Sequence, residues 1–575
     1  MRTPYPTSRL DAVVRAGRAA LLCGLLPLAT AHAADAPAAE AHPRPWSGYL
    51  DDVAYVTRVG TWPAFAPGLV EIETYGTSRA GRPLLAAVLS SDADAADDRP
   101  AVLVVAGLDA LHPAGSEMAV RLTESLLRNH PGILEEVTVL VVPRANPDGI
   151  EALMSGVNTG QRGGIGRIDA DRDGLLDEDP PTDLNGDGVV TMMRLADPPL
   201  RHPPTHLADP GEPRIMRSPD RAAGERPTHA MFVEGLDHDG DGSIGEDGFG
   251  EVRIDRNFMH LFREHDVRSG THPLSEPEAL ALAEFILARP NIVGAVVLGP
   301  HDNAIRMPDT KEKDVTGRTP RGIDSGDEPG HRLLQEAWTA HTGQTRSATE
   351  EDAGGLHAWL YAHRGIPTLA TTGWGRPDPP EASEESGEST ADPEMLGWLA
   401  WSDSGADGAG FVPWTAFEHP QLGPVEIGGM VPGFTANPPV ETLDELAAGQ
   451  AAFVADLASM RPRIAVEGPE IEDLGGGVAR IRLVVRNDGR LPLRTAMART
   501  NRAIRPLRVG IPLDRARIMQ GRPNVMIEDL SAEGGRRTIE WVVRRPEEPW
   551  EIVLDDPQIG RRGLPVPALG KEGRR

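Results

Sequence analysis

The sequence predicts an α/β protein with a parallel sheet covered by helices on both faces, followed by a small β-sandwich. Short apolar, β-branched runs recur with helical stretches between them, which is typical of a parallel sheet buried on both faces. The pattern then changes to alternating strands and turns. A chain of 575 residues is too long for one ordinary core, so at least two domains are expected. The strands expected in the sheet are residues 69–76, 86–91, 101–107, 137–145, 293–299 and 366–373.

Two stretches between these strands predict helices. Residues 116–129 carry apolar side chains at helical spacing, with Ser116 as the expected N-cap. Residues 275–288 open with a capping box that runs from Ser275 to Glu278. Both helices are expected to pack against the sheet. Neither pattern indicates catalytic or binding residues.

Three further stretches differ in composition from the strand and helix pattern. Residues 160–250 form a long acidic, polar insertion between the fourth and fifth strands. Residues 376–396 are acidic and rich in Pro and Ser, which predicts a solvated loop. Residues 462–575 alternate in hydrophobicity without a helical pattern, which predicts the β-sandwich.

The N-terminal residues 1–33 resemble a secretory signal peptide. Basic residues precede a short apolar run and the small-residue site Ala31-His32-Ala33, so we expect cleavage after Ala33 and export to the periplasm or outside the cell. The run is too short to span a membrane, and no transmembrane segment is expected in the mature chain. The one cysteine, Cys23, lies in this segment, so the mature chain holds no disulfide.

The charge balance excludes one class of partner. The chain has 86 Asp and Glu against 58 Lys and Arg, for a formal net charge of -28. This acidity argues against binding of nucleic acid or another polyanion.

The insertion holds three loops that begin D-x-[DN]-x-D-G. Oxygen ligands on alternate residues wrap around a hard cation, and the glycine allows the sharp turn, so the pattern predicts structural calcium binding. None of the loops has the usual Glu at the twelfth position, and solvated acidic loops are the alternative. The expected calcium ligands are Asp169, Asp171, Asp173, Asp183, Asn185, Asp187, Asp237, Asp239 and Asp241.

Sequence blocks along residues 47–460 follow a recognisable order. They include "VVAGLDALHPAGSEMAV", "VPRANPDGIEA", "VRIDRNFMHLF" and "GGLHAWLYAHRGIPTLATTGW". In this order they resemble zinc carboxypeptidases of the carboxypeptidase A type. The resemblance implies an α/β/α domain with a mixed, mostly parallel sheet. It also implies one zinc ion at the C-terminal ends of the strands and hydrolysis of C-terminal peptide bonds.

The resemblance also implies where the metal ligands lie. The first family motif is His-x-x-Glu; with Gly115 as the anchor, its His position falls on Asp109 and its Glu position on His112. A carboxylate and an imidazole both bind zinc, so the exchange still permits a site. The alternative is that Asp109 caps a turn and His112 is a solvated loop residue. The third ligand is expected at His301, although the count back from the following proline points to Gly299.

The catalytic glutamate of the family has no clear counterpart here. Its position falls on Thr372 or Gly373. A threonine hydroxyl cannot act as a general base near neutral pH. Glu426 is a nearby strand carboxylate that could substitute for it, and an ordinary solvated glutamate is the alternative.

The substrate-binding positions are altered as well. The Asn-Arg pair that holds the substrate carboxylate in the family reads Asp255-Arg256. Arg256 keeps the planar fork that recognises a carboxylate, whereas Asp255 would repel that carboxylate or bind the arginine. A second family arginine matches Arg162.

These alterations leave the enzymatic activity open. The main interpretation is an exported metallocarboxypeptidase-family protein with a degenerate site and weak or no peptidase activity. A pseudoenzyme of this fold that binds a peptide or cell-wall fragment is one alternative, and an active, divergent amide hydrolase is another. Loss of a general base costs orders of magnitude in rate, which favours a silent site.

Overall fold

The structure is a computed structural model, and it describes residues 41–169, 174, 176, 179–240, 242–245, 252–347, 353–377 and 389–567. The chain divides into two units, Met1–Ala39 and Glu40–Arg575, and all described residues belong to the second. The expected signal peptide lies outside the described residues, as do the expected calcium ligands Asp171, Asp173 and Asp241.

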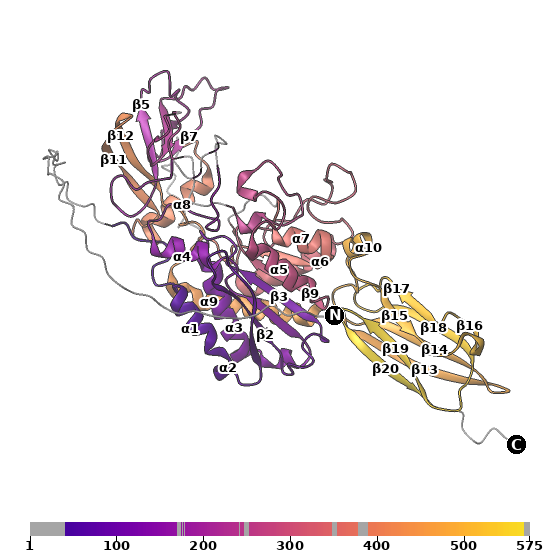
Figure 1. The fold of residues 1–575 in the computed structure, drawn as a ribbon. Helices are drawn as coiled ribbons and strands as arrows, with labels where there is room; N and C mark the ends of the chain where they lie inside the picture. Colours follow the sequence, from indigo (N-terminus) through magenta and orange to yellow (C-terminus); the bar gives the residue numbers. More distant parts are fainter. Residues whose placement is uncertain are drawn as a thin grey trace, which may run out of the picture. The chain divides into compact units, whose positions relative to one another are not determined.

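Six strands of the described chain form one mixed sheet (Figure 1). In spatial order they are β1 (Val70–Thr77), β2 (Pro83–Leu89), β4 (Thr138–Val142), β3 (Ala101–Ala106), β9 (Ile292–Leu298) and β10 (Thr368–Thr371). Strands β4, β3, β9 and β10 run parallel, and the β1–β2 hairpin adds an antiparallel edge. The mixed, mostly parallel sheet predicted from the resemblance is confirmed.

Helices cover both faces of this sheet (Figure 1). All residues of β3 are buried, and they alternate between two apolar layers. Val102 and Val104 pack toward one layer, while Leu103 and Val105 pack toward the other. The first layer includes α3 (Pro113–Asn129) and α9 (Leu443–Met460), and the second includes α5 (Pro277–Leu287) and α7 (Leu356–Arg364). The predicted three-layer α/β/α arrangement is therefore present.

Prolines decide where the two predicted helices begin. Helix α3 begins at Pro113, so the prediction of Ser116 as its N-cap is wrong. The ring fixes φ for a first helical turn and needs no N–H donor there. Ser116 lies inside the helix, and its hydroxyl accepts a hydrogen bond from Nε of Arg144 (3.0 Å). Helix α5 likewise begins at Pro277, and the predicted capping box does not form because Glu278 accepts a distant backbone N–H.

The acidic insertion contributes to a second sheet. This antiparallel sheet has the order β11-β12-β5-β8, and it pairs two strands of the insertion with two strands from the far side of the sequence. Its small core includes Met193, Leu195 and Ile427. Its strands are β5 (Met192–Ala196), β8 (His229–Val233), β11 (Phe411–His419) and β12 (Gly423–Met430).

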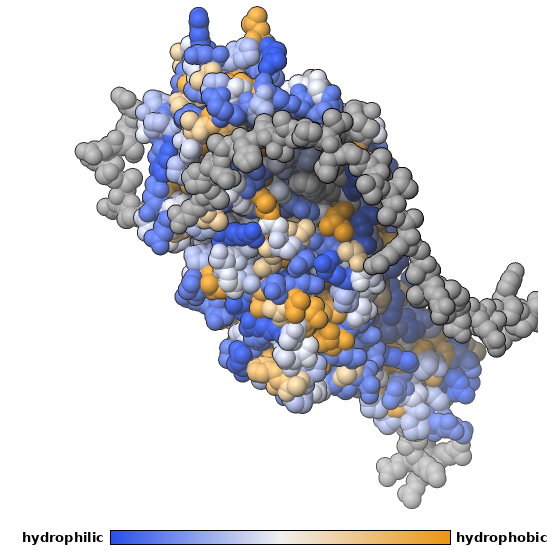
Figure 2. All heavy atoms as spheres, turned by 60° about the vertical axis from the view of Figure 1, so that its left-hand side comes forward, coloured by the Kyte–Doolittle hydropathy of each residue, from blue (hydrophilic) through white to orange (hydrophobic). Residues whose placement is uncertain are grey.

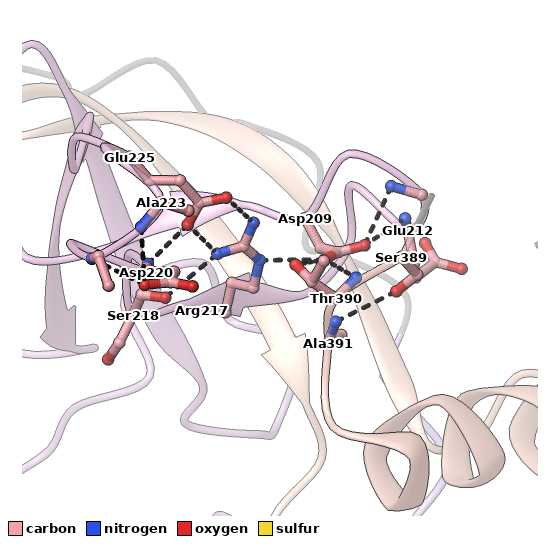
Figure 3. A network of polar contacts seen from close by, with 12 residues as sticks. Asp209, Glu212, Arg217, Ser218, Asp220, Ala223, Glu225, Ser389, Thr390 and Ala391 are labelled. Carbon is pink, nitrogen blue, oxygen red and sulfur yellow. Dashed lines mark hydrogen bonds and ion pairs between the residues drawn. The ribbon is translucent and has the colours of Figure 1, made fainter. Parts of the chain in front are cut away.

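A buried polar network joins the insertion to the segment after residue 388 (Figure 3). Nε of Arg217 lies 3.1 Å from Asp209, and the Thr390 N–H donates to the same carboxylate (3.0 Å). Burial alone would raise the pKa of Asp209, but its hydrogen bonds lower that pKa to about 2. The predicted solvated loop is wrong at its C-terminal end, because Thr390 docks here and α8 (Pro393–Gly405) follows. Residues 378–388 lie outside the described chain.

The C-terminal strands form two four-stranded sheets that enclose a separate core. Leu483, Val509, Trp541 and Leu554 pack between the sheets, and the predicted β-sandwich is confirmed. The first sheet has β13 (Ile464–Gly475), β14 (Val478–Asn487), β18 (Gly535–Arg544) and β16 (Ile518–Gln520). The second has β17 (Asn524–Ile527), β15 (Leu507–Gly510), β19 (Trp550–Asp556) and β20 (Gly560–Val566).

One short helix departs from the prediction that this C-terminal stretch has none. Helix α10 (Ala496–Asn501) begins after Thr495, whose hydroxyl caps it and also donates to the Gly365 carbonyl (2.9 Å). Six residues are too few to show a helical period in the sequence.

No helix within the described ranges is long and apolar enough to cross a bilayer. Figure 2 shows one face of the molecule, where apolar residues occur in small groups among hydrophilic ones.

Candidate functional site

The candidate site lies where three parallel strands end. Asp109 follows β3, His301 follows β9, and Thr372 comes directly after β10. The carboxyl ends of neighbouring parallel strands meet at one edge of a sheet, which is the usual binding edge of α/β proteins. All three side chains are buried. The order of the strands therefore brings together residues that are far apart in the sequence.

Asp109 is held by arginine. Its Oδ2 accepts hydrogen bonds from Nη2 (2.5 Å) and Nε (3.0 Å) of Arg162, and Nη2 of Arg253 lies 3.7 Å away. Its Oδ1 accepts the Leu111 N–H (2.9 Å), so the expected turn-capping contact is present. The carboxylate is 1% exposed. Both oxygens are therefore engaged by groups of this chain.

His112 is fixed in one tautomer. Its Nε2–H donates to the Thr372 carbonyl (3.0 Å), which leaves Nδ1 as the unprotonated nitrogen. Burial lowers the pKa of His112 to about 4, so the ring is neutral at neutral pH. Since only 2% of the residue is exposed, the alternative of a solvated loop residue is wrong. A Cβ at Gly115 would lie 3.1 Å from Nδ1, so glycine gives this ring its room.

His301 faces Asp255. Its Nε2 lies 3.6 Å from Oδ2 of Asp255, and its ring centroid is 4.8 Å from that of His357. Asp255 is fully buried and also accepts from Nη2 of Arg253 (2.7 Å). Burial would raise the pKa of Asp255, but the Arg253 guanidinium holds that pKa well below its usual range. The competing position Gly299 has no side chain to offer a metal.

These contacts join five residues into one chain: guanidinium and carboxylate alternate from Arg162 through Asp109 and Arg253 to Asp255, and the ring of His301 lies beside Asp255. Sequence reasoning placed four of these residues in the site and missed Arg253. Arg253 could have been found from the sequence because it lies in the family block "VRIDRNF", two residues before Asp255. Each buried carboxylate is neutralised by a guanidinium, which is the condition for stable burial.

The donor set does not fit zinc as it is arranged. A zinc ligand oxygen lies about 2.0 to 2.2 Å from the ion, whereas Oδ2 of Asp109 has two guanidinium groups within 3.7 Å. Within the described chain, the one group of three or more metal-binding side chains whose ligand atoms converge lies elsewhere. Asp109, His112 and His301 do not form such a group. A cation at Asp109 would have to displace Arg162.

The expected positions for the general base hold no carboxylate. Oγ1 of Thr372 donates to the Trp374 carbonyl (2.8 Å) and lies 3.1 Å from Oγ of Ser347. Gly373 has φ +79°, and a Cβ there would lie 2.7 Å from Cε of Met118. No side chain fits at that position without rearrangement.

Glu426 lies on β12, in the second sheet. It forms an ion pair with Nε of Arg194 (2.8 Å), a residue of the neighbouring strand β5. Arg194 also stacks on the ring of Trp414 at 4.5 Å from its centroid. The described contacts of Glu426 are thus with its own sheet and not with Asp109 or His301.

The substrate-binding arginines differ in their surroundings. Arg162 is engaged with Asp109. Arg256 is half-buried, and its backbone packs so closely on Gly354 that a Cβ there would lie 2.0 Å from the Arg256 carbonyl oxygen. Asp255 pairs with Arg253, two residues earlier.

The acidic loops curl as their pattern predicts. Asp183 accepts the Gly186 N–H (2.7 Å) and the Gly188 N–H (2.8 Å), and Asp237 accepts the corresponding Gly240 N–H (2.6 Å). Oδ2 of Asp169 likewise accepts a backbone N–H in the first loop. In the second loop, Nδ2 of Asn185 donates to Asp187 (3.0 Å). Calcium binding by these loops stays a prediction.

Comparison with known proteins bears on the first part of the chain. Residues 63–173 match the zinc carboxypeptidase family model, and this segment contains β1 to β4 and both Asp109 and His112. The chain resembles the zinc carboxypeptidases. Residues 463–566, which span the sandwich strands, match a domain of unknown function, DUF8731. No curated protein gives a significant match to the chain.

Several solved carboxypeptidase structures are similar to the chain. Thrombin activatable fibrinolysis inhibitor has 14% identity and a TM-score of 0.39, with 72% of this chain and 76% of that chain covered. Carboxypeptidase A from Helicoverpa armigera has 12% identity and a TM-score of 0.34, with 63% and 73% covered. Murein-tripeptide amidase MpaA from Escherichia coli O157 has 17% identity and a TM-score of 0.23, with 53% and 82% covered.

Proposed function

We propose that this zinc-carboxypeptidase-like chain binds a peptide or a peptide-like cell-wall fragment and has little or no peptidase activity. The observation that carries the proposal is the ion pair in which two nitrogens of Arg162 donate to Oδ2 of Asp109. In this arrangement a guanidinium neutralises the carboxylate at the first metal position. The ends of the parallel strands would still bind a ligand, while the carboxylates there are neutralised by arginines of the same chain.

At the two positions expected for the general base, the described residues offer no group that would activate water. Hydrolysis of an amide needs a base that takes a proton from the attacking water, and such a base contributes about 10²- to 10⁴-fold in rate. Thr372 donates its hydroxyl proton to a backbone carbonyl, and Gly373 has no side chain. His112 is held as a hydrogen-bond donor to that strand end. Binding without turnover is the outcome that these contacts favour.

A ligand with a free carboxylate fits the remaining chemistry. Arg256 ends the 3₁₀ turn Ile254–Arg256, directly after Asp255, and its guanidinium is a planar fork of the kind that recognises a carboxylate. The overall negative charge of the chain makes a local guanidinium a selective point of attachment. We therefore propose peptides with a free C-terminus as the ligand class.

The experiment compares turnover with binding in the same preparation. The full chain is incubated with peptides that carry a free or an amidated C-terminus, with added zinc and with a chelator, and released amino acids are measured. Calorimetry then measures peptide binding to the wild type and to Arg256→Gln. We expect no zinc-dependent release, and binding of the free-acid peptide that Arg256→Gln weakens about tenfold or more. Zinc-dependent release of C-terminal residues would overturn the proposal.

One observation favours an active, divergent amide hydrolase as the second candidate. The tautomer of His112 leaves Nδ1 unprotonated, which is the form that a metal-binding imidazole needs. Such an enzyme would require Arg162 to leave Asp109. The same assay decides between the two candidates.

We further propose that the mature chain is exported. The support is the N-terminal pattern of basic residues, apolar run and small-residue site at residues 1–33. Mass spectrometry of the protein from the source cell would give an N-terminus at Ala34 if cleavage follows Ala33. An intact Met1 on the cell-associated protein would contradict export by this route.

A further inference from the structure

Three aspartates converge in the acidic insertion, away from the site described above. One carboxylate oxygen from each of Asp179, Asp237 and Asp239 lies within 4.8 Å of the other two. Asp237 and Asp239 open the third acidic loop, as the sequence pattern indicates. Asp179 closes the first acidic segment, "DADRDGLLDED", and sequence reasoning did not include it.

Backbone contacts hold Asp179 beside the third loop. Pro181 and Gly235 form an antiparallel bridge, and the Thr182 N–H donates to the Glu234 carbonyl (2.8 Å). Because of these contacts, the residues that follow Asp179 lie beside residues 234 and 235, which connect β8 to the third acidic loop. The position of the carboxylate is thus set by the chain on both sides of the cluster.

Asp179 is buried with one oxygen unsatisfied. The residue has 0% of its surface exposed. Its Oδ1 accepts the backbone N–H (2.6 Å) of His238 and faces Nδ1 of the same residue (3.1 Å). Its Oδ2 has no hydrogen-bond partner among the described residues. A buried carboxylate oxygen without a partner is costly, and two further carboxylates nearby add repulsion, so the cluster needs a cation.

We infer that Asp179, Asp237 and Asp239 bind a hard divalent cation, and the chemistry of the donors points to calcium. All three donors are carboxylate oxygens, which calcium prefers, and the group found among the described residues contains no thiolate or imidazole that would select zinc. The ring of His238 is directed at Asp179 as a hydrogen-bond partner instead. This site is independent of the proposed peptide-binding function.

The ion would join two separate stretches of chain. Asp179 belongs to the first acidic segment, and Asp237 belongs to the third loop. The Asp237 N–H donates to Oε1 of Gln421 (3.0 Å), in the turn between β11 and β12. Binding would therefore fasten the end of the first acidic segment to the third loop, which already contacts the β11–β12 turn through Gln421.

The test uses the full chain stripped with a chelator and titrated with calcium, magnesium or zinc in a calorimeter. The variants are Asp179→Asn and Asp239→Asn. The matched control is Asp314→Asn, because Asp314 also accepts loop N–H groups from Thr316 (3.1 Å) and Arg318 (3.3 Å) but belongs to no such carboxylate group. Circular dichroism checks that each variant is folded.

We expect calcium to bind the wild type and the control equally, and each test variant to lose about tenfold or more in affinity. Calcium should also raise the Tm of the wild type but not that of Asp179→Asn. Since Asp239 is exposed, its variant decides the question if Asp179→Asn does not fold. The inference is overturned by the absence of calcium binding, by zinc binding without calcium binding, or by equal affinity in Asp239→Asn and the wild type.

Discussion

Arg162 and Asp109 form an ion pair at the carboxyl end of β3, in which Nη2 (2.5 Å) and Nε (3.0 Å) of the arginine donate to the same oxygen, Oδ2, of the aspartate. The aspartate side chain is 1% exposed and that of the arginine is 26% exposed. A contact of this kind neutralises a carboxylate in a position where water cannot solvate it. It also joins two residues that the sequence separately assigned to a metal and to a substrate.

Replacement of Arg162 by methionine should show how much the neutralisation of buried Asp109 contributes to stability. We expect Arg162→Met to lower the free energy of unfolding by about 2 to 4 kcal/mol, because Asp109 keeps only the more distant Arg253 as a cation. Urea unfolding measures the change. In the control Arg332→Met, whose partner Glu328 lies on the exposed face of a helix, the loss should stay below about 1 kcal/mol. Equal effects in both variants would contradict the importance of the buried pair.

The same variant should alter metal binding. With Arg162 gone, the carboxylate of Asp109 can accept a cation, so Arg162→Met should bind zinc more tightly than the wild type by about tenfold or more. Zinc titration by calorimetry gives both affinities. Unchanged affinity would mean that the guanidinium is not what keeps zinc from this carboxylate.

Gly373 should not tolerate a side chain. Its φ of +79° and the 2.7 Å approach to Cε of Met118 predict that Gly373→Ala lowers stability by about 2 to 4 kcal/mol. Gly408 is the matched control, because it has φ +77° but open space around its Cβ position. Gly408→Ala should cost only the backbone strain, about 1 kcal/mol. The difference between the two variants in urea unfolding measures the steric part alone.

Acid should destabilise the protein through His331. Burial lowers the pKa of His331 to about 4, and its Nε2–H donates to the Asn303 carbonyl (2.8 Å). The unfolded chain takes up this proton near pH 6.5, so the stability that depends on the neutral ring is present above pH 6.5 and lost as the pH falls toward 4. The wild type should therefore lose up to about 3 kcal/mol more than His331→Gln over this range. Exposed His272 provides the control His272→Gln, which should keep the wild-type pH profile.

The network around Asp209 should be sensitive to loss of charge. Asp209→Asn removes the charge that Nε of Arg217 faces and an acceptor for the Thr390 N–H, while Arg217 keeps its ion pair with Glu225, so the unfolding free energy should fall by about 1 to 3 kcal/mol. Because the folded pKa of Asp209 is about 2, this contribution is present above pH 3.8 and lost as the pH falls toward 2. The exposed ion pair of Asp403 with Arg214 supplies the control Asp403→Asn, for which we expect a change below about 1 kcal/mol. Thermal unfolding at pH 7 compares the stabilities of Asp209→Asn and Asp403→Asn with that of the wild type.

Local sequence patterns predicted most of the fold. Each expected strand of the first sheet overlaps an observed one, because a buried parallel strand is a continuous apolar run that the sequence displays directly. The helix starts at Ser116 and Ser275 were wrong because Pro113 and Pro277 outweigh a nearby side-chain cap. The six-residue helix α10 was missed because so short an element has no period.

The site was predicted as a set of residues but not as an arrangement. Alignment to the family blocks identified Asp109, His112 and His301, and strand order places them near the same edge. The pairing of Asp109 with Arg162, and the bridging place of Arg253, depend on how loops fold over that edge. The convergence of Asp179 with the third acidic loop is likewise tertiary, and a local motif cannot contain it.

The pairing of β12 with β5 has a consequence for attempts to shorten this protein. An insertion that formed its own compact body could be excised at its base without harm to the remainder. Here Glu426 and Ile427 of β12 lie in register with Arg194 and Met193, so deletion of residues 160–250 would remove one of the two strands that pair with β12. The truncated chain would display a bare row of backbone donors and acceptors, which invites association between molecules. Truncation should therefore spare both inserted strands together with Asp179, Asp237 and Asp239.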